Sequence, residues 1–373
     1  MYWRGVISTA AAIAGVYCAG GSPALADSGV RKPPAAVRAE STDTKEQARD
    51  VPAPAPLFTS VQASKGHRSY MEDDYFLSAD GRFAAVYDGH GGASVSKYLR
   101  QNLYTQVKAN LPLEEQECGE EHIIQALKAA FKTVDDEVLK VRHWSYQGST
   151  AVAVVIHPTV AGGNGNCSII TANVGDSRAV LCRRGKAVEI TKDHKPNATA
   201  ELDRIEALGG NVRWFGFIDP EGRPIEGTGV YRINGNLAVA RAIGDSSERP
   251  FVSGECEIRS MPMDHEGDQF IIIATDGLWD VMTSDEVVQY VQAVMGGAMG
   301  ALREGESRGE FPLASDRPVD MKLSDWTQRY ADDRGMIRAA MMSRKKKMAR
   351  YLAQEAIRRG TMDNVTVVVM FFR

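Results

Sequence analysis

The sequence predicts an α+β fold in which two antiparallel β-sheets stack face to face and helices flank both outer faces. Strand-like and helix-like segments occur in groups rather than in strict alternation, which favours antiparallel sheets. The segments FIIIAT (270–275) and VTVVVMFF (365–372) are continuously apolar, which indicates strands that are covered on both sides. Together these two observations favour a β-sandwich between layers of helices.

The first half of the folded part is expected to contain strands followed by helices and then an antiparallel meander over 149–191. Aromatic and β-branched residues between Gly- and Asp-containing turns predict strands at 58–64, 73–79 and 82–88. Apolar residues at helical spacing predict helices at 93–110 and 121–141. The turns expected within the meander are GGNGN at 162–166, GDS at 175–177 and RRG at 183–185.

The second half is expected to contain three more strands and three helices. The strands are predicted at 237–245, 269–277 and 364–372. The helices are predicted at 201–210, closed by a left-handed Gly209 or Gly210, at 284–295, and at 336–360, stopping at Gly360. Residues 296–335 are Gly-rich and weakly periodic, which indicates an insertion. The basic run RKKK (344–347) is interpreted as the solvated face of a helix, with a docking patch as the alternative.

Composition excludes some classes of partner. The chain has 373 residues, enough for one large core or two modest ones, and a net charge of -4, which gives no reason to expect nucleic acid as a partner. The five cysteines show no spacing typical of zinc sites and are too sparse for a disulfide scaffold. A soft-metal site is therefore disfavoured, and we expect a monomer.

The N-terminal segment differs from the rest of the chain. Residues 1–26 combine Arg4, an apolar run and a small-residue ALA site, which predicts a signal or transit peptide and hence the secretory pathway or an organelle. Cytoplasmic location is the alternative, and contact with a membrane is expected only if this segment is retained as an anchor. Residues 27–56 are rich in Pro, Ala and charge, which predicts a disordered linker. The folded part is expected to begin near Leu57.

Acidic residues stand at the predicted ends of several strands. They are Asp88 after FAAVY, Asp276 after FIIIAT, Asp363 before NVTVVV, Glu72 and Asp73 between two short strands, and Asp176 in an expected hairpin turn. If these positions converge at one end of the sheets, six carboxylates crowd one cleft and need cations to offset their repulsion. An all-oxygen ligand set favours Mg²⁺ or Mn²⁺. Calcium is an alternative, although the spacing of an EF-hand is absent.

Glycine follows the acid in two of these places. Without a Cβ, Gly89 lets the backbone approach closely enough for its carbonyl to face a metal ion, and Gly277 relieves the same kind of turn. The alternative is that each DG pair simply makes a tight turn.

Many ordered motifs carry a resemblance to a known family. They are KGHRSYMEDDY, AAVYDGHGG, GSTAVAVVI, ITANVGDSRAVLCRRGKAVEITKDHKP, ELDRIEALGG, LAVARAIGD, IIIATDGLWDVM and GTMDNVTVVVM. In this order they resemble the metal-dependent serine/threonine protein phosphatases of type 2C (PPM-type). The resemblance covers about 57–373, interrupted by 296–335, and implies one catalytic domain with a β-sandwich and two metal ions at its edge.

The resemblance also implies roles for the acidic residues. Asp88 is expected to bridge two Mg²⁺ or Mn²⁺ ions, with the Gly89 carbonyl on one ion and Asp276 and Asp363 on the other. Glu72 and Asp73 are expected to hold metal-bound waters. Asp176, together with Asp276, matches the site of a weaker third ion.

The activity implied is hydrolysis of phosphoserine and phosphothreonine in phosphorylated proteins by a metal-activated water. Arg68 matches the arginine that binds phosphate, for which its planar fork is suited. His90 matches the general acid that protonates the departing oxygen. No phosphocysteine motif or serine elbow is present, in agreement with a water nucleophile. His67 matches no role.

Residues 210–235 lie where the family carries a variable flap beside the active site. Trp214, Phe215 and Phe217 are candidates for contact with substrate, and a self-packed loop is the alternative. Two other functions compete with a protein phosphatase: a binding module that kept the fold without the activity, and a two-metal hydrolase of small phosphates or nucleotides. Loss of an acid would be the signature of the first, and none is missing.

Overall fold

A computed structural model of the chain describes residues 57–112, 118–158, 167–225, 227–296 and 334–372. The expected leader (1–26), the linker (27–56) and the turn at 162–166 lie outside the described residues. So does the insertion expected at 296–335, apart from Gly296 and the first two residues of the last helix.

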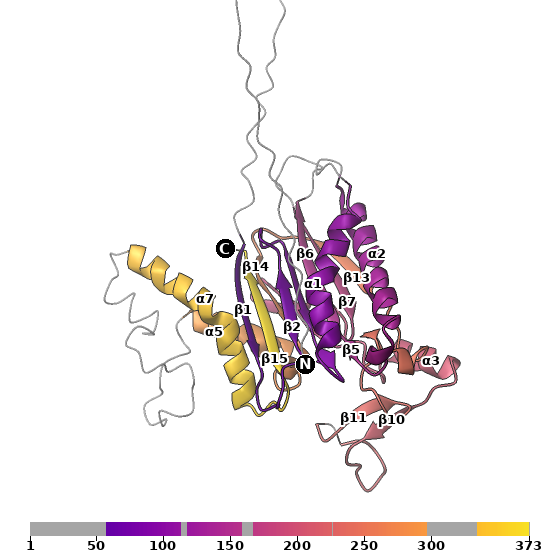
Figure 1. Cartoon of the computed structure of the whole chain (residues 1–373). Coiled ribbons are helices and arrows are strands. Elements are labelled where there is room, and N and C mark those ends of the chain that lie inside the picture. The colour runs from indigo at the N-terminus through magenta and orange to yellow at the C-terminus, as the bar shows by residue number, and fades with distance from the viewer. Residues whose placement is uncertain (1–56, 113–117, 159–166, 226, 297–333, 373) are drawn as a thin grey trace, which may run out of the picture. The chain divides into compact units, whose positions relative to one another are not determined.

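Two five-stranded antiparallel sheets form the centre of the structure (Figure 1). The order of strands in one sheet is β1 (Phe58–Ser64), β15 (Val365–Phe371), β14 (Asp268–Ala274), β8 (Arg178–Arg183) and β9 (Lys186–Glu189). The order in the other is β13 (Glu257–Pro262), β7 (Cys167–Val174), β6 (Ala151–Pro158), β3 (Phe83–Tyr87) and β2 (Asp74–Leu77). A small third sheet joins β12 (Ile243–Gly244), β5 (Gly148–Ser149) and β4 (Gly89–His90).

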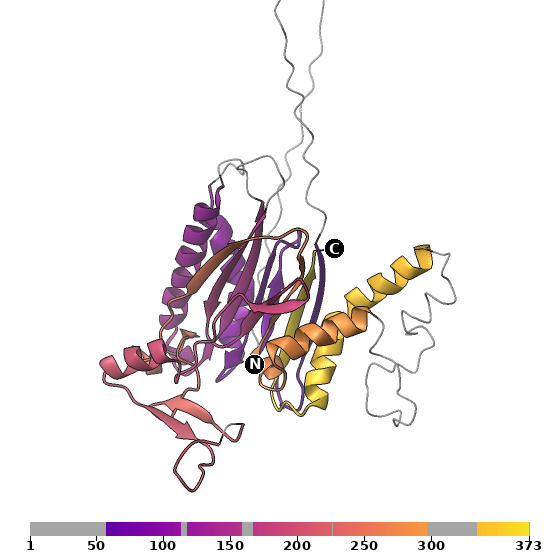
Figure 2. The ribbon, with the colours of Figure 1, turned by 180° about the vertical axis from the view of Figure 1, so that it is seen from behind.

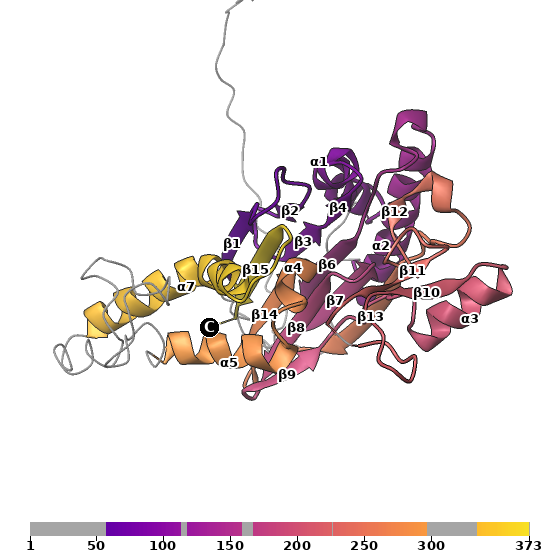
Figure 3. The ribbon, with the colours of Figure 1, turned by 90° about the horizontal axis from the view of Figure 1, so that it is seen from below.

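The sheets stack on each other and carry helices on their outer faces, as Figure 3 shows in a view from below. Side chains of both sheets share one buried cluster, in which Val86 and Val152 of one sheet meet Ile273 and Val368 of the other. The outer helices are α1 (Ser94–Ala109) and α2 (Glu120–Leu139) on one side, and α5 (Ser284–Met295) and α7 (Arg334–Arg358) on the other. The predicted α+β sandwich flanked by helices is confirmed.

The helices end and pack for local reasons. Thr283 caps α5, where its hydroxyl accepts from the N–H of Glu286 and the Glu286 carboxylate accepts from the N–H of Thr283. Gly360 follows α7 in the left-handed conformation, with φ 93°. The solvated face predicted for RKKK is wrong at Lys345. Lys345 is buried with its Nζ 5.3 Å from the centre of the Phe371 ring, and Arg344 donates to the Val294 carbonyl.

Two elements differ from the prediction. The turn at 175–177 is not a hairpin, because β7 and β8 belong to different sheets and the chain crosses between them at Asp176. The strand predicted at 237–245 is reduced to Ile243–Gly244. Ala240 donates to the His194 carbonyl and Ala242 to the Ser253 carbonyl, so this apolar stretch bonds to separate loops, not to one strand. The apolar pattern of residues 237–245 therefore reflects burial between loops, not pairing within a strand.

A smaller lobe follows the sandwich in sequence. It consists of α3 (Thr199–Ala207) and the hairpin of β10 (Val212–Phe215) and β11 (Val230–Ile233), with Ile205 and Ile233 in its own buried cluster. Gly209 ends α3 in the left-handed conformation, with φ 85°, as predicted. Figure 2 shows the hairpin projecting beyond the sheets. No helix in the described part of the chain combines the length and apolar composition needed to cross a bilayer.

Candidate active site

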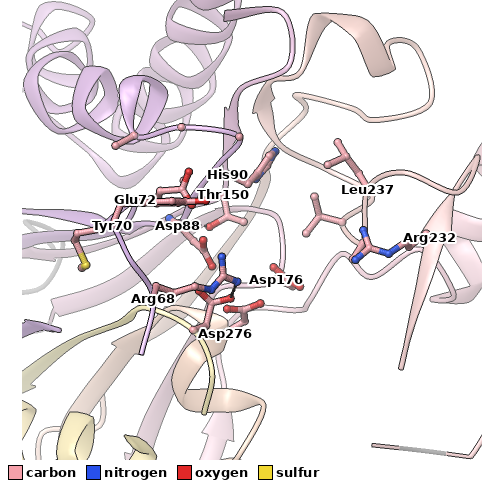
Figure 4. Close-up of a pocket in the computed structure, with 18 residues that line it drawn as sticks. Arg68, Tyr70, Glu72, Asp88, His90, Thr150, Asp176, Arg232, Leu237 and Asp276 are labelled. Carbon is pink, nitrogen blue, oxygen red and sulfur yellow. Dashed lines mark hydrogen bonds and ion pairs between the residues drawn. The ribbon is translucent and has the colours of Figure 1, made fainter. Parts of the chain in front are cut away.

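A pocket of about 710 Å³ opens at one end of the sandwich, where strands of both sheets end (Figure 4). Asp88 directly follows β3, Asp176 follows β7 at the crossover, and Asp276 begins the short helix α4 (Asp276–Trp279) after β14. The antiparallel arrangement brings these strand ends together. The predicted site residues that line the pocket are Arg68, Glu72, Asp88, Gly89, His90, Asp176, Asp276 and Asp363.

Asp73 lies behind this lining. It is buried, and its Oδ2 accepts from Thr275 Oγ1 at 2.9 Å, next to Asp276. In the described structure Asp73 does not line the pocket itself, and its neighbours separate it from the opening.

The side chain of Asn364 holds the loop that carries Arg68 and Glu72. Asn364 Oδ1 accepts from the backbone N–H of Glu72 at 2.8 Å. Its Nδ2 donates to the carbonyls of Lys65 at 2.9 Å and Tyr70 at 3.1 Å. Because Asn364 adjoins Asp363, the start of β15 fixes the loop between β1 and β2 against the pocket.

The two glycines after the acids are required by close packing. A Cβ on Gly89 would lie 2.5 Å from the Glu72 carbonyl oxygen and 2.8 Å from Ser96 Oγ. A Cβ on Gly277 would overlap the Asn364 carbonyl oxygen. Neither glycine is left-handed, so a tight turn is not what demands glycine at these positions. Both allow the strand ends to approach each other closely.

The carboxylates of the pocket perturb one another. Burial, and then the charges of Asp276 and Asp363, raise the pKa of Asp73 to about 8. Burial and the neighbouring carboxylates likewise raise the pKa of Asp88 and of Asp276 well above the usual range. Burial and mutual repulsion therefore disfavour the ionised forms of these carboxyl groups unless a positive charge lies close to them.

The donor set fits hard divalent cations. Asp176 Oδ1 and Asp276 Oδ1 are buried and have no hydrogen-bond partner among the described residues. Buried carboxylate oxygens without partners are costly unless a cation binds them. Within the described residues, no three His, Cys, Asp or Glu side chains form a ready-made cage for an ion.

One positive charge already sits at the edge of this cluster. Lys195 Nζ lies 3.0 Å from Asp176 Oδ2 and 3.8 Å from Asp280 Oδ1. Burial lowers the pKa of Lys195, but the surrounding carboxylates outweigh it and raise the pKa above its usual value. Sequence reasoning missed Lys195 and Asp280. Asp280 could have been found from its position one helical turn after Asp276.

Arg68 and His90 both face the pocket and both have carboxylate partners. Arg68 Nη2 donates to Asp363 Oδ2 at 2.6 Å, and its Nε donates to the Met362 carbonyl at 3.1 Å. His90 Nε2 lies 2.7 Å from Asp245 Oδ2. Burial lowers the pKa of His90, but the hydrogen bond and charge of Asp245 outweigh burial and raise it. Asp245 was not predicted, because nothing local in AIGD marks it as the partner of a residue near position 90.

The second wall of the pocket comes from the lobe with α3 and the hairpin. Arg232, Leu237, Ala238 and Val239 line it, whereas Trp214, Phe215 and Phe217 do not. Trp214 packs edge-on against Tyr231 and donates to the Phe217 carbonyl at 2.9 Å. Trp214 thus contacts Tyr231 within the hairpin, and Arg232 lines the site.

Comparison with known proteins places these features in context. The family model described as "Protein phosphatase 2C" matches residues 60–303. A rice (Oryza sativa subsp. japonica) protein named "Probable protein phosphatase 2C 45" is 38% identical over 239 residues, which cover 62% of this chain and 75% of the relative. The Arabidopsis thaliana protein "Protein phosphatase 2C 77" is 33% identical over 331 residues, or 84% of this chain and 66% of that one.

Solved structures share the fold. A C. elegans sex determining protein superposes with a TM-score of 0.62 at 23% identity, covering 86% of this chain and 65% of that chain. A phosphatase from a pathogenic strain of Toxoplasma gondii gives a TM-score of 0.57 at 20% identity, covering 85% and 93%. At these identities the likeness concerns the fold alone.

Proposed function

The chain belongs to the protein phosphatase 2C family of metal-dependent serine/threonine phosphatases, and on that premise we propose how its pocket works. It hydrolyses phosphoserine and phosphothreonine in proteins at a centre of two divalent cations, Mg²⁺ or Mn²⁺. Asp88, Gly89, Asp276 and Asp363 would hold the two ions, and Glu72 and Asp73 would support them. Asp176 would supply a further buried carboxylate.

The observation that carries the proposal is the convergence of strand ends on unpartnered carboxylate oxygens. Asp88, Asp276 and Asp363 come from three strands in two sheets and line one pocket. Oδ1 of Asp276 is buried without a partner among the described residues. When bound, two such cations supply an activated water near neutral pH and offset charge on the phosphoryl oxygens.

Arg68 has the geometry to position the phosphate. Its Nε and one Nη2 hydrogen are engaged by Met362 and Asp363, which leaves three guanidinium hydrogens for phosphoryl oxygens. The ion pair with Asp363 fixes the orientation of the Arg68 guanidinium before substrate binds. Less side-chain entropy is therefore lost on binding.

His90 is placed to protonate the departing seryl or threonyl oxygen. Nε2 faces the Asp245 carboxylate, so in the protonated ring the Nδ1–H would be the proton available for transfer. The Asp245 carboxylate behind the ring favours the protonated form, which a general acid requires.

The test compares hydrolysis of a nucleotide with that of matched phosphoserine, phosphothreonine and phosphotyrosine peptides, with Mn²⁺ or Mg²⁺ present and with chelator as control. We expect cation-dependent release of phosphate from the phosphoserine and phosphothreonine peptides, with little from phosphotyrosine. Turnover of nucleotides but not of phosphopeptides would support a small-phosphate hydrolase instead. Binding of phosphopeptide without turnover would support a binding module.

A further inference from the structure

The hairpin beside the pocket has two chemically different faces. The register pairs Val212 with Ile233, Arg213 with Arg232, Trp214 with Tyr231, and Phe215 with Val230. Because side chains alternate along a strand, the two arginines share one face with Phe215 and Val230. We refer to these four residues as the basic face.

The basic face is the one next to the active site. Ile233, on the opposite face, is fully buried in the cluster of the α3 lobe, with Val212 packed against it. Arg232 lines the pocket, and Figure 4 shows it across the opening from Arg68. A peptide whose phosphate enters the pocket between Arg68 and Arg232 would bring its flanking residues next to this face.

The described residues of the hairpin do not neutralise the charges of the basic face. Arg223, in the loop of the same hairpin, is paired with Asp219 at 2.8 Å and Glu221 at 3.3 Å. Arg213 is exposed and makes no ion pair with any residue that the structure describes. Arg232 Nη1 donates to a neutral group, the Asn236 carbonyl.

Two arginines directly opposite each other in a hairpin oppose its folding. Like charges in cross-strand register are destabilising, and this two-stranded sheet has no further strand to compensate. An anion bound between them would remove the repulsion and be held by charge-assisted hydrogen bonds. The half-exposed side chains of Phe215 and Val230 add apolar surface beside that site.

We propose that the basic face binds acidic side chains that flank the phosphorylated residue, so that the enzyme prefers phosphoproteins with acidic segments next to the target serine or threonine. This inference rests on the proposed function, because the phosphate must occupy the pocket for the flanking residues to reach the hairpin.

The experiment compares three phosphothreonine peptides that differ only in Asp, Ser or Lys on both sides of the target residue, with Mn²⁺ present. We expect kcat/KM for the acidic peptide to exceed that for the neutral one by roughly three- to tenfold, as one or two exposed charge pairs allow. The preference should shrink as salt rises. Because each preference is a ratio within one protein, any loss of folded enzyme cancels.

Arg213→Gln should reduce the ratio of acidic to neutral peptide, and Arg213→Glu should invert the order so that the Lys peptide is preferred. Arg223→Gln is the matched control, since that arginine is already paired and should keep the wild-type ratio. Equal kcat/KM for all three peptides in the wild type, or an unchanged ratio in Arg213→Glu, overturns the inference. Failure to hydrolyse even the neutral peptide overturns the proposed function instead.

Discussion

His90 Nε2 lies 2.7 Å from Oδ2 of Asp245, although the two residues are 155 positions apart in the chain. Asp245 is almost fully buried, and its backbone is left-handed, with φ 49°. A carboxylate held in this way orients the imidazole and favours its protonated form. Asp245 is therefore a positioning residue for the proposed general acid.

Replacing Asp245 by Asn should slow the enzyme in a manner that depends on the leaving group. We expect kcat for a phosphoserine peptide to fall by about ten- to a hundredfold, because proton transfer to a poor leaving group needs an oriented and charged imidazole. Aryl phosphates, whose oxyanions need little protonation, should be affected much less. Equal losses for both substrates, measured at saturating Mn²⁺, would argue for a purely structural role.

Gly148 is the position where a single methyl group should disturb the same pair. A Cβ there would overlap Asp245 Oδ2 and lie 2.6 Å from His90 Nε2. Gly148→Ala should reproduce the substrate-dependent loss of Asp245→Asn and cost about 1–3 kcal/mol of unfolding free energy as overpacking. Gly119→Ala is the control, since its Cβ meets only His122 Nδ1 at 3.7 Å. Wild-type turnover in Gly148→Ala would contradict the arrangement.

Metal-free protein should lose stability as pH rises, because Asp73 has a folded-state pKa raised from 3.8 to about 8. Below pH ~4 the carboxyl is protonated in both states, and between pH ~4 and ~8 only the folded state keeps the proton. The stabilising contribution of Asp73 therefore disappears as pH rises through that window.

The measurement is urea unfolding of wild type and Asp73→Asn in chelator, at several values from about pH 5 to about pH 8. The variant cannot ionise, so it should gain stability relative to wild type as pH increases. A difference between the two proteins that does not change with pH contradicts the shifted pKa.

Glu286 joins the start of α5 to the end of α7 and should carry stability with the opposite pH dependence. Its Oε1 accepts from Arg359 Nη1 at 2.8 Å, and its Oε2 accepts from the Thr283 N–H at 2.8 Å. The hydrogen bond from Arg359, followed by those from Thr283, lowers the pKa of Glu286 to about 2. This contribution is present above the usual pKa of 4.5 and is lost as pH falls toward 2.

Glu286→Ala should cost about 1 kcal/mol near pH 7, the usual value of a helix cap. The loss of unfolding free energy caused by this substitution should be smaller at acidic pH. Asp285→Ala, one residue earlier on the exposed surface of the same turn, is the control and should have a smaller effect. Chemical denaturation at both pH values measures the difference, and a penalty for Glu286→Ala that grows in acid would show that the depressed pKa is wrong.

The sandwich could be predicted because its strands and helices have strong local patterns. Asp88 and Asp276 stand directly after continuous apolar runs, so their place at strand ends follows from the residues beside them. The crossover at Asp176 could not be distinguished from a hairpin, since a short Gly-containing turn serves both and only the partner strands differ. The strand predicted at 237–245 failed because burial between loops produces the same apolar pattern as pairing.

Residues of the site that act through distant partners had no local signal. Asp245 meets His90 only because β12 pairs with β5, and β5 with β4. Lys195 reaches Asp176 through a loop that returns to the crossover, where His194 donates its backbone N–H to the Gly175 carbonyl. Such contacts follow from tertiary topology, which one sequence does not reveal.

The most direct test of the account is the number of Mn²⁺ ions bound by chelator-stripped protein, measured by calorimetric titration at neutral pH. The account predicts at least two ions per chain in the wild type, and weaker or fewer ions in Asp276→Asn and in Asp363→Asn, with the fold retained by circular dichroism. A wild-type chain that binds fewer than two ions, or variants that bind as the wild type does, would contradict a centre built from these strand ends.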